Sequence, residues 1–243
     1  MLASTLIAEV AADIFDGDYE RWDEDYHLAS LNAGERQLVF FKPTAYIIAG
    51  VYQLAAGPRQ SLPDGTSSYQ DPAAATLLKA IELVEITRNM GTDGLTAGTA
   101  IVPVEIQDID ELYPGWRAVT AAATVQHVMF DKNDRTTFSV FPKQPSASMG
   151  WIEAVYSAVP TAIATVGGSY AVDCNLSDEY AEPLKNYMKF RAYSMDAANS
   201  QYSADRALAH WNLFLMQIGR KDLVEQRYPS RRNYGNSNQQ LSQ

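Results

Sequence analysis

Three histidines and several acids are the side chains of this sequence that are best suited to acid–base or metal chemistry. His27, His127 and His210 are far apart in the chain, and none is followed by a second His or Cys at the spacing of a metal site. We interpret each as a structural or surface histidine. Cys174 is the only cysteine, so a cysteine-based metal site lacks ligands and no internal disulfide can form, which favours a reducing compartment during assembly.

Three short segments resemble functional motifs without matching them. Asp108, Asp110 and Glu111 could pair for acid–base catalysis, but acids are also favoured near the positive end of a helix, and we prefer that interpretation. Residues 89–94 (NMGTDG) lack the downstream bidentate Glu of a calcium loop, and residues 167–169 (GGS) lack the Lys of a phosphate-binding loop. The sequence therefore predicts no catalytic residue, no cofactor-binding residue and no metal ligand.

Charge is distributed unevenly along the chain, which has a net charge of −10. Residues 1–35 contain nine acids and one base, whereas residues 220–243 contain two acids and five bases. In an assembly, ends of opposite sign favour contacts between one copy and the next. The acidic balance argues against binding DNA by phosphate neutralisation, which requires clustered Lys and Arg. No apolar run approaches the roughly 20 residues that span a bilayer, so no membrane partner is expected.

Both ends of the chain show the periodicity of helices. Helices are expected over residues 5–15 and from Asp23, which can cap the second helix, to the stop at Pro43. Residues 180–219 predict an antiparallel helical hairpin, because apolar residues recur at steps of three and four in both halves. The members of this seam are Leu184, Tyr187, Met188, Ala192 and Met195 in the first half, then Ala204, Ala207, Leu208, Trp211, Phe214, Leu215 and Ile218.

The middle of the chain shows the pattern of short strands. Six segments are rich in β-branched and aromatic residues and are separated by turn residues: 47–54, 81–88, 101–106, 125–130, 137–141 and 152–157. We expect them to form an antiparallel sheet, and leave open whether there is one sheet or two. Residues 107–119 predict a short helix, broken by Pro-Gly, that covers the sheet.

These elements together predict an α+β protein, with a helical bundle body and an inserted antiparallel β domain of about six strands. Residues 1–45 and 174–219 form the predicted helical body. Residues 46–173 form the predicted β domain, with its short helix near 107–119. Residues 220–243 have no periodicity and few apolar groups, so we expect a flexible C-terminal tail.

Two sets of side chains in the helical segments have alternative interpretations. Arg191 lies seven residues after Leu184 and so on the seam of the hairpin, where a charge requires a partner. An intramolecular pair with Asp205 is the preferred interpretation, and a contact with a neighbouring subunit is the alternative. The tryptophans Trp22, Trp116 and Trp211 lie within helical patterns and are interpreted as core residues rather than sugar-stacking surfaces.

An ordered set of segments resembles the head-to-tail adaptor proteins of tailed bacteriophages, the class that includes the tail tubular protein A of short-tailed phages. The segments are RWDEDYHLASLNAGERQLVFFKPTA, VYQLAAGPRQSLP, ELYPGWRA, TFSVFPKQP and YMKFRAYSMDAANSQYSADRALAHWNLFLMQIG. Within them the resemblance rests on Trp22, Asn32, Arg36, Leu62, Pro63, Pro114, Trp116, Phe138, Pro142, Arg191, Ala192, Asp196 and Phe214. It covers nearly the whole chain up to Gly219.

The resemblance implies a structural protein without enzymatic activity. It implies a homo-oligomeric ring, usually dodecameric, that joins the portal protein to a tail nozzle or tail tube protein at the head–tail interface of the virion, after assembly in the host cytoplasm. Genomic DNA would leave through its lumen without specific binding. The predicted contacts between subunits are Arg191, Asp196 and Asp205, and those with the portal are Arg227, Tyr228, Arg231, Arg232 and Tyr234 in the basic tail.

Two other functions compete with the structural adaptor. The first is a β-sandwich that binds host glycans or a receptor, which the Tyr and Trp content and the strands favour, with Trp151 and Tyr156 as the residues to test. The second is a hydrolase with an unusual site, which rests only on scattered Asp and Glu.

Overall fold

A computed structural model describes residues 1–131, 134–197 and 200–220. The chain divides into two compact units. Residues Met1–Lys42 and the described part of the chain from Ala162 onward form one, which we call the helical unit. Residues Pro43–Thr161 form the other, which we call the sheet unit.

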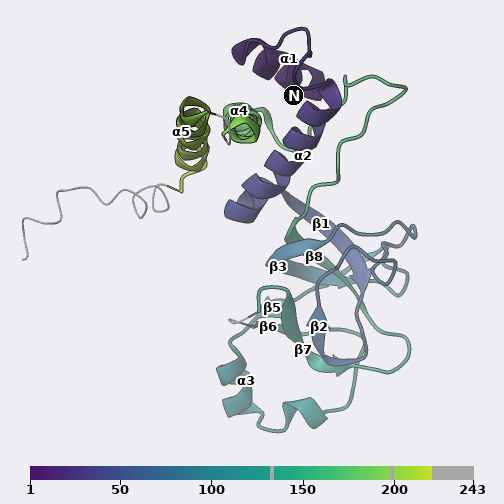
Figure 1. Cartoon of the computed structure of the whole chain (residues 1–243). Helices are drawn as coiled ribbons and strands as arrows, with labels where there is room; N and C mark the ends of the chain where they lie inside the picture. Colours follow the sequence, from purple (N-terminus) through teal and green to yellow (C-terminus); the bar gives the residue numbers. More distant parts are fainter. Residues whose placement is uncertain (132–133, 198–199, 221–243) are drawn as a thin grey trace, which may run out of the picture. The chain divides into compact units, whose positions relative to one another are not determined.

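The helical unit combines elements from both ends of the sequence (Figure 1). These elements are α1 (Ala3–Asp13), α2 (Glu24–Phe41), a 3₁₀ turn (Asp178–Tyr180), α4 (Ala181–Asp196) and α5 (Gln201–Gln217). Helix α4 packs against each of the other three helices. Its buried side chains Leu184, Met188 and Ala192 are completely inaccessible to solvent, so α4 is the central helix of this unit.

Local sequence determines where α2 begins and how closely it approaches α4. The Asp23 carboxylate accepts a 2.7 Å hydrogen bond from the backbone N–H of Tyr26, which confirms the predicted N-cap. Gly34 faces α4, and a Cβ atom added there would lie 3.0 Å from a ring carbon of Tyr187 and 3.2 Å from Leu184. Glycine therefore allows α2 and α4 to pack closely at this point.

Two polar side chains of α2 bind the chain where it returns from the sheet unit. The Asn32 amide donates to the carbonyl oxygen of Ile163 (2.9 Å) and accepts from its N–H (2.7 Å). One turn later the Glu35 carboxylate, which is 1 % exposed, accepts from the backbone N–H of Asn175 (2.9 Å), from its side-chain amide (2.6 Å) and from the N–H of Leu176 (3.4 Å). We call Asn32 and Glu35 the α2 clamp. It fixes the segment that leads into α4.

The two helices predicted for residues 180–219 are present as α4 and α5, and polar contacts join them at several levels. The Asn186 side chain donates to Gln217 (2.9 Å) and hydrogen bonds to the ring of His210 (2.9 Å). Nearer the turn, Arg206 donates to the hydroxyl of Tyr193 (3.2 Å). The partners run in opposite directions along the two helices, as an antiparallel hairpin requires.

The sheet unit contains two four-stranded sheets around one shared core (Figure 1). Its strands are β1 (Ile47–Gln53), β2 (Gly57–Ser61), β3 (Ala80–Met90), β4 (Ala97–Ala100), β5 (Val102–Pro103), β6 (His127–Phe130), β7 (Thr137–Gln144) and β8 (Trp151–Ala158). The sheet orders are β1-β8-β3-β4 and β2-β7-β6-β5. Buried residues of both sheets, among them Tyr156 and Phe138, belong to a single hydrophobic cluster.

The predicted architecture of a helical bundle with about six antiparallel strands is wrong. The described residues form five α-helices and eight strands in two sheets, and β5 pairs with β6 in parallel. Strand β2 is not among the six predicted strands because its sequence, GPRQS, has low β-propensity. It forms because buried Gln60 bonds the backbone of Ala55 and Gly57 while the strand pairs with β7. Strand β4 (AGTA) was missed because it is an exposed edge.

The fifth helix belongs to the sheet unit and covers one of its sheets. Helix α3 (Ile106–Leu112) and a 3₁₀ turn (Trp116–Ala118) enclose a cluster of Ile109, Trp116 and Met129. Trp116 is fully buried, and its indole N–H donates to Asp110 at 2.7 Å. The predicted broken helix over residues 107–119 is therefore present as two short turns of helix. None of the described helices is both long and apolar enough to cross a membrane.

The α2 clamp predicts a large loss of stability when its carboxylate is removed. Glu35→Ala removes the carboxylate that accepts from the buried N–H of Leu176 and from the half-buried N–H of Asn175, and we expect the free energy of unfolding to fall by about 3 kcal/mol. Glu35→Gln keeps one acceptor oxygen and should cost less. Urea unfolding followed by circular dichroism measures both variants, with Glu111→Ala at an exposed helical position as the matched control. An equal loss in Glu35→Ala and Glu111→Ala would contradict the role of the clamp.

Candidate docking surfaces

The side chains suited to catalysis do not converge in the structure. His27 lies in α2, His210 in α5 and His127 in β6, where its ring stacks on Phe141 at 6.1 Å. Asp110 accepts from Trp116 and Arg117 and so has a structural role. Within residues 1–131, 134–197 and 200–220, no group of three or more His, Cys, Asp or Glu side chains is placed to hold a metal ion.

His27 is a buried histidine whose surroundings favour its neutral form. Its ring is completely inaccessible and makes edge contacts with Tyr19 (6.0 Å) and Tyr26 (5.9 Å). No described residue hydrogen bonds to either ring nitrogen. Burial lowers the pKa of His27, while the carboxylates of Asp16 and Asp23 act in the opposite direction. This histidine therefore packs the start of α2 and is not positioned to exchange protons with a substrate.

A hollow in the sheet unit, at one end of β1, β3 and β8, contains no ionisable side chain. It has a volume of about 480 Å³. Its walls are formed by Gln53, Asn89, Met90, Gly91, Thr92, Ala123, Thr124, Ser148, Met149 and Gly150. Asn89 is 5 % exposed and already bonds the backbone N–H and carbonyl of Val125, both at 2.7 Å. These walls offer neither a general acid–base group nor an activated nucleophile.

The helical unit carries an apolar hollow of a different kind on its hairpin. We call it the hairpin groove. It has a volume of about 280 Å³ and is lined by Phe190, Ser194, Ala197, Ala204, Ala207, Leu208 and Trp211. The rings of Phe190 and Trp211 lie 5.0 Å apart and form its aromatic wall, and small side chains form much of the remainder. Trp211 is only half-buried, so its assignment to the core was wrong, whereas Trp22 and Trp116 are buried as predicted.

The three predicted subunit-contact residues have different surroundings. Arg191 directly follows Phe190 of the groove and is half-buried, and no described residue forms an ion pair with it. Asp205 is exposed and accepts from Gln201 (3.0 Å) rather than from Arg191. Asp196 forms an ion pair with Arg21, which connects the end of α4 to the chain before α2. Within a single chain these residues do not form one site.

The predicted portal contacts Arg227, Tyr228, Arg231, Arg232 and Tyr234 lie outside the described residues. The groove itself was not predicted from the sequence. The sequence did contain a signal for it, because Ser194, Ala197, Ala204 and Ala207 place small side chains beside two aromatic ones. Small residues at helical spacing leave room between helices that a larger side chain would fill.

An apolar groove with an aromatic wall, together with described histidines and acids that do not converge, is typical of a protein that binds other proteins. The class defined in this way is a structural assembly protein. The chain belongs to the SU10 adaptor protein family, whose model matches residues 1–239. No curated protein sequence matches the chain significantly.

Family membership confirms the resemblance to phage head-to-tail adaptors that the sequence segments indicated. The chain has a structural role as a phage adaptor, and this class is not a class of enzymes. Adaptors of this kind act at the head–tail position of the virion, where they contact portal and tail components. The match covers the ends of the chain as well as its centre.

The burial of His27 predicts a pH dependence of stability with a definite sign. Its pKa in the folded chain lies below the ordinary value of 6.5, so the unfolded chain takes up a proton that the folded chain excludes. Stability should therefore fall as the pH decreases below 6.5, by up to about 1.4 kcal/mol per pH unit. His27→Phe keeps a ring between Tyr19 and Tyr26 and should give a flatter profile. Urea unfolding at several pH values checks this, and identical profiles would contradict it.

Proposed function

We propose that copies of this chain form a ring, a dodecamer as in the class it resembles, between the portal and a tail nozzle or tail tube protein of the virion. The adaptor family supports a position between these components. The observation that carries the ring is the hairpin groove, an apolar hollow of α4 and α5 that residues 1–131, 134–197 and 200–220 leave open. Anchor side chains at protein–protein interfaces insert into pockets of this kind.

Electrostatics supports contacts between copies rather than contacts with DNA. The net charge of −10 repels phosphates, so genomic DNA would pass the lumen of the ring without being held. Arg191, Asp196 and Asp205 are our proposed contacts between copies. Asp205 is exposed, and the Asp196 side chain remains 20 % exposed beside Arg21.

The rival function, a glycan- or receptor-binding module, loses one of its two candidate residues. Tyr156 is completely buried in the core shared by the two sheets, so it has no face for a sugar. Trp151 is half-buried at the start of β8, and its ring lies within 3 Å of the position that a Cβ atom on Gly94 would occupy. The adaptor is therefore the function that the chain supports best.

The ring is tested by incubating the full-length chain with its portal protein. Native mass spectrometry or negative-stain electron microscopy should show a stoichiometric ring on the portal. A monomer in the absence of the portal is compatible with this proposal, because binding to a template shifts an assembly equilibrium by mass action. Failure to bind the portal at any concentration would contradict it.

The basic C-terminal segment is our proposed portal contact, through Arg227, Tyr228, Arg231, Arg232 and Tyr234. Deleting residues 220–243 should abolish co-sedimentation with portal-bearing capsids and leave the circular dichroism spectrum of the folded chain unchanged. A triple variant with Gln at the three arginines should bind more weakly and with a smaller salt dependence, because it removes charge alone. Unchanged capsid binding by the deletion variant would overturn this assignment.

A further inference from the structure

Strand β1 is the edge strand of its sheet and has only β8 as a neighbour. The two strands pair antiparallel along the whole of β1 without a register shift. Just beyond its ends, the N–H of Leu54 donates to the carbonyl oxygen of Gly150 (2.9 Å) and the carbonyl oxygen of Tyr46 accepts from the N–H of Ala158 (3.2 Å). Alternate residues of an antiparallel strand bond the same neighbour, so the even-numbered residues of β1 bond β8 and the odd-numbered residues face away from it.

Four residues of β1 therefore direct their backbone groups to the outer side of the sheet. They are Ile47, Ala49, Val51 and Gln53. No described residue hydrogen bonds to the backbone N–H or carbonyl oxygen of any of the four. Ile47 is 42 % exposed, Ala49 and Gln53 are also exposed, and Val51 is half-buried. We call these backbone groups the β1 edge, and a row of this kind is a template for a further strand.

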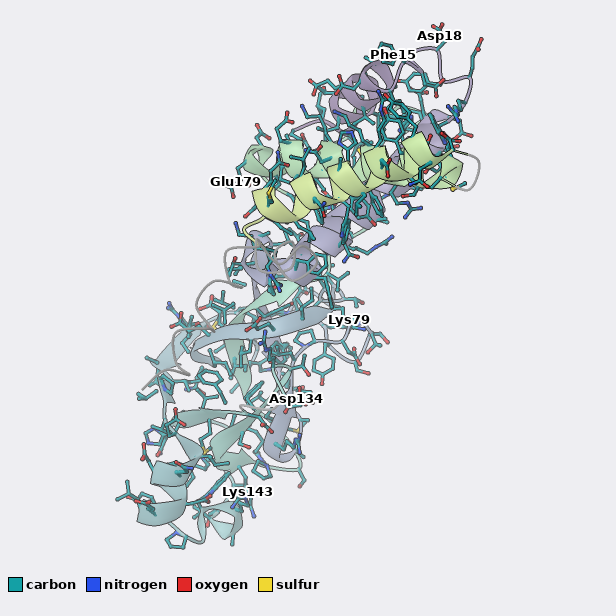
Figure 2. All side chains as sticks on the ribbon, turned by 60° about the vertical axis from the view of Figure 1, so that its left-hand side comes forward. Phe15, Asp18, Lys79, Asp134, Lys143 and Glu179 are labelled. Carbon is teal, nitrogen blue, oxygen red and sulfur yellow. The ribbon has the colours of Figure 1, made fainter. Side chains whose placement is uncertain are left out.

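The other three sheet edges are protected against pairing with a further strand. Strands β4 and β5 are four and two residues long. Strand β2 contains Pro58, which has no N–H, and Arg59, whose guanidinium lies 4.0 Å from the carboxylate of Asp134, labelled on the sheet unit in Figure 2. Short length, proline and charge are the means by which proteins prevent pairing between edges. Strand β1 has seven residues, IIAGVYQ, and carries neither a proline nor a charge.

The sequence around β1 is unusually poor in charge. Residues 43–58 contain no Asp, Glu, Lys or Arg, although 20 % of the chain is charged. Two copies of a chain with a net charge of −10 repel each other. An uncharged segment is where this repulsion opposes a close approach of two copies least.

Among the described strand edges, a second β1 is the best match for the β1 edge. The edges of β2, β4 and β5 are shorter, and β2 is interrupted by proline. In an antiparallel pair centred on Gly50, Ile47 lies opposite Gln53 of the second copy, and Ala49 lies opposite Val51. Each of these positions has outward backbone groups, so four pairs with two hydrogen bonds each satisfy the β1 edge of both copies. No like charges face each other in this arrangement.

We propose that two copies of the chain, in the absence of the portal, pair through β1 in this antiparallel arrangement. Their two four-stranded sheets would then form one continuous sheet. The same surface is used on both copies, so the contact closes with two copies and generates no ring. It is therefore separate from the ring proposed above and does not rest on it. It covers an edge strand that would otherwise be open to aggregation before the chain meets the portal.

A charge at the centre of the β1 edge tests the contact. Ala49→Lys at this exposed position places two lysines on diagonal positions across the two-fold axis. We expect the dissociation constant of the dimer to rise at least about tenfold. Sedimentation velocity of the full-length chain without portal, over a concentration series, measures this. The matched control Ala100→Lys makes the same change at an exposed position of β4, the opposite edge of the sheet, and should dimerise like the wild type.

Cross-linking tests the register. Two versions of the full-length chain with Cys174→Ser carry either Ile47→Cys or Gln53→Cys. A mixture of the two, treated with a short bismaleimide, should give a covalent dimer, because residues 47 and 53 lie opposite each other. Each version alone should give none, since equivalent residues of the two copies are then six positions apart along the strands, or about 20 Å.

Hydrogen exchange followed by NMR tests the contact without any substitution. The N–H groups of Ile48, Gly50 and Tyr52 should be protected at every concentration, because they bond β8. Those of Ala49 and Val51 should become protected only at concentrations at which the dimer forms. Exchange at Ala49 and Val51 that does not depend on concentration would contradict the proposal.

The outcomes separate this inference from the adaptor function. A monomer at every concentration would overturn the β1 contact, as would a dimer that Ala49→Lys leaves intact or that Ala100→Lys weakens equally. Covalent dimers from either cysteine version alone would contradict the proposed register. All of these measurements use the chain without portal, so their failure would leave the adaptor function standing.

Discussion

The helical unit depends on the α2 clamp, because its helices come from two parts of the sequence separated by the entire sheet unit. Apolar contacts alone would leave the returning chain free to slide along α2. Asn32 and Glu35 remove that freedom, since each binds backbone groups more than 130 residues away and a buried carboxylate is tolerated only when its oxygens are satisfied. Burial raises the pKa of Glu35, while the hydrogen bonds from Asn175 and Leu176 act in the opposite direction. The clamp thus fixes the segment that follows the sheet unit in the chain, and through this segment it fixes the position of α4.

Once α4 is fixed, the surfaces proposed for assembly are fixed as well. Its buried face packs on α1 and α2, and its polar contacts with α5 leave the hairpin groove open between Phe190 and Trp211. The same helix receives Asp13 from α1 and, through Asp196, the side chain of Arg21 from the loop between α1 and α2. A chain that acts through an apolar groove on its helical unit needs no catalytic centre to function. This agrees with its membership of the SU10 adaptor protein family.

Sequence reasoning predicted the helices well and the sheets poorly, for physical reasons. The hairpin helices α4 and α5 have long apolar stripes, and Asp23 is a local N-cap of α2. Residues that are close in the sequence therefore suffice to predict these helices. Strands β2 and β4 depend on pairing with distant strands, and their own residues have little β-propensity. The partners of Glu35, Asn175 and Leu176, lie 140 and 141 residues away in the chain, so no local pattern indicates the clamp. The groove was missed because periodicity assigns Trp211 to a seam without showing how much of its ring α4 covers.

The central claim is that this chain works through contacts that its helical unit makes with neighbouring copies. A cryo-electron microscopy map of the assembled virion neck, at a resolution that shows side chains, tests this most directly. The account predicts a closed ring in which each hairpin groove is covered by a surface of the adjacent copy. Grooves that face solvent in a complete ring, or chains that contact only the portal and not one another, would contradict it.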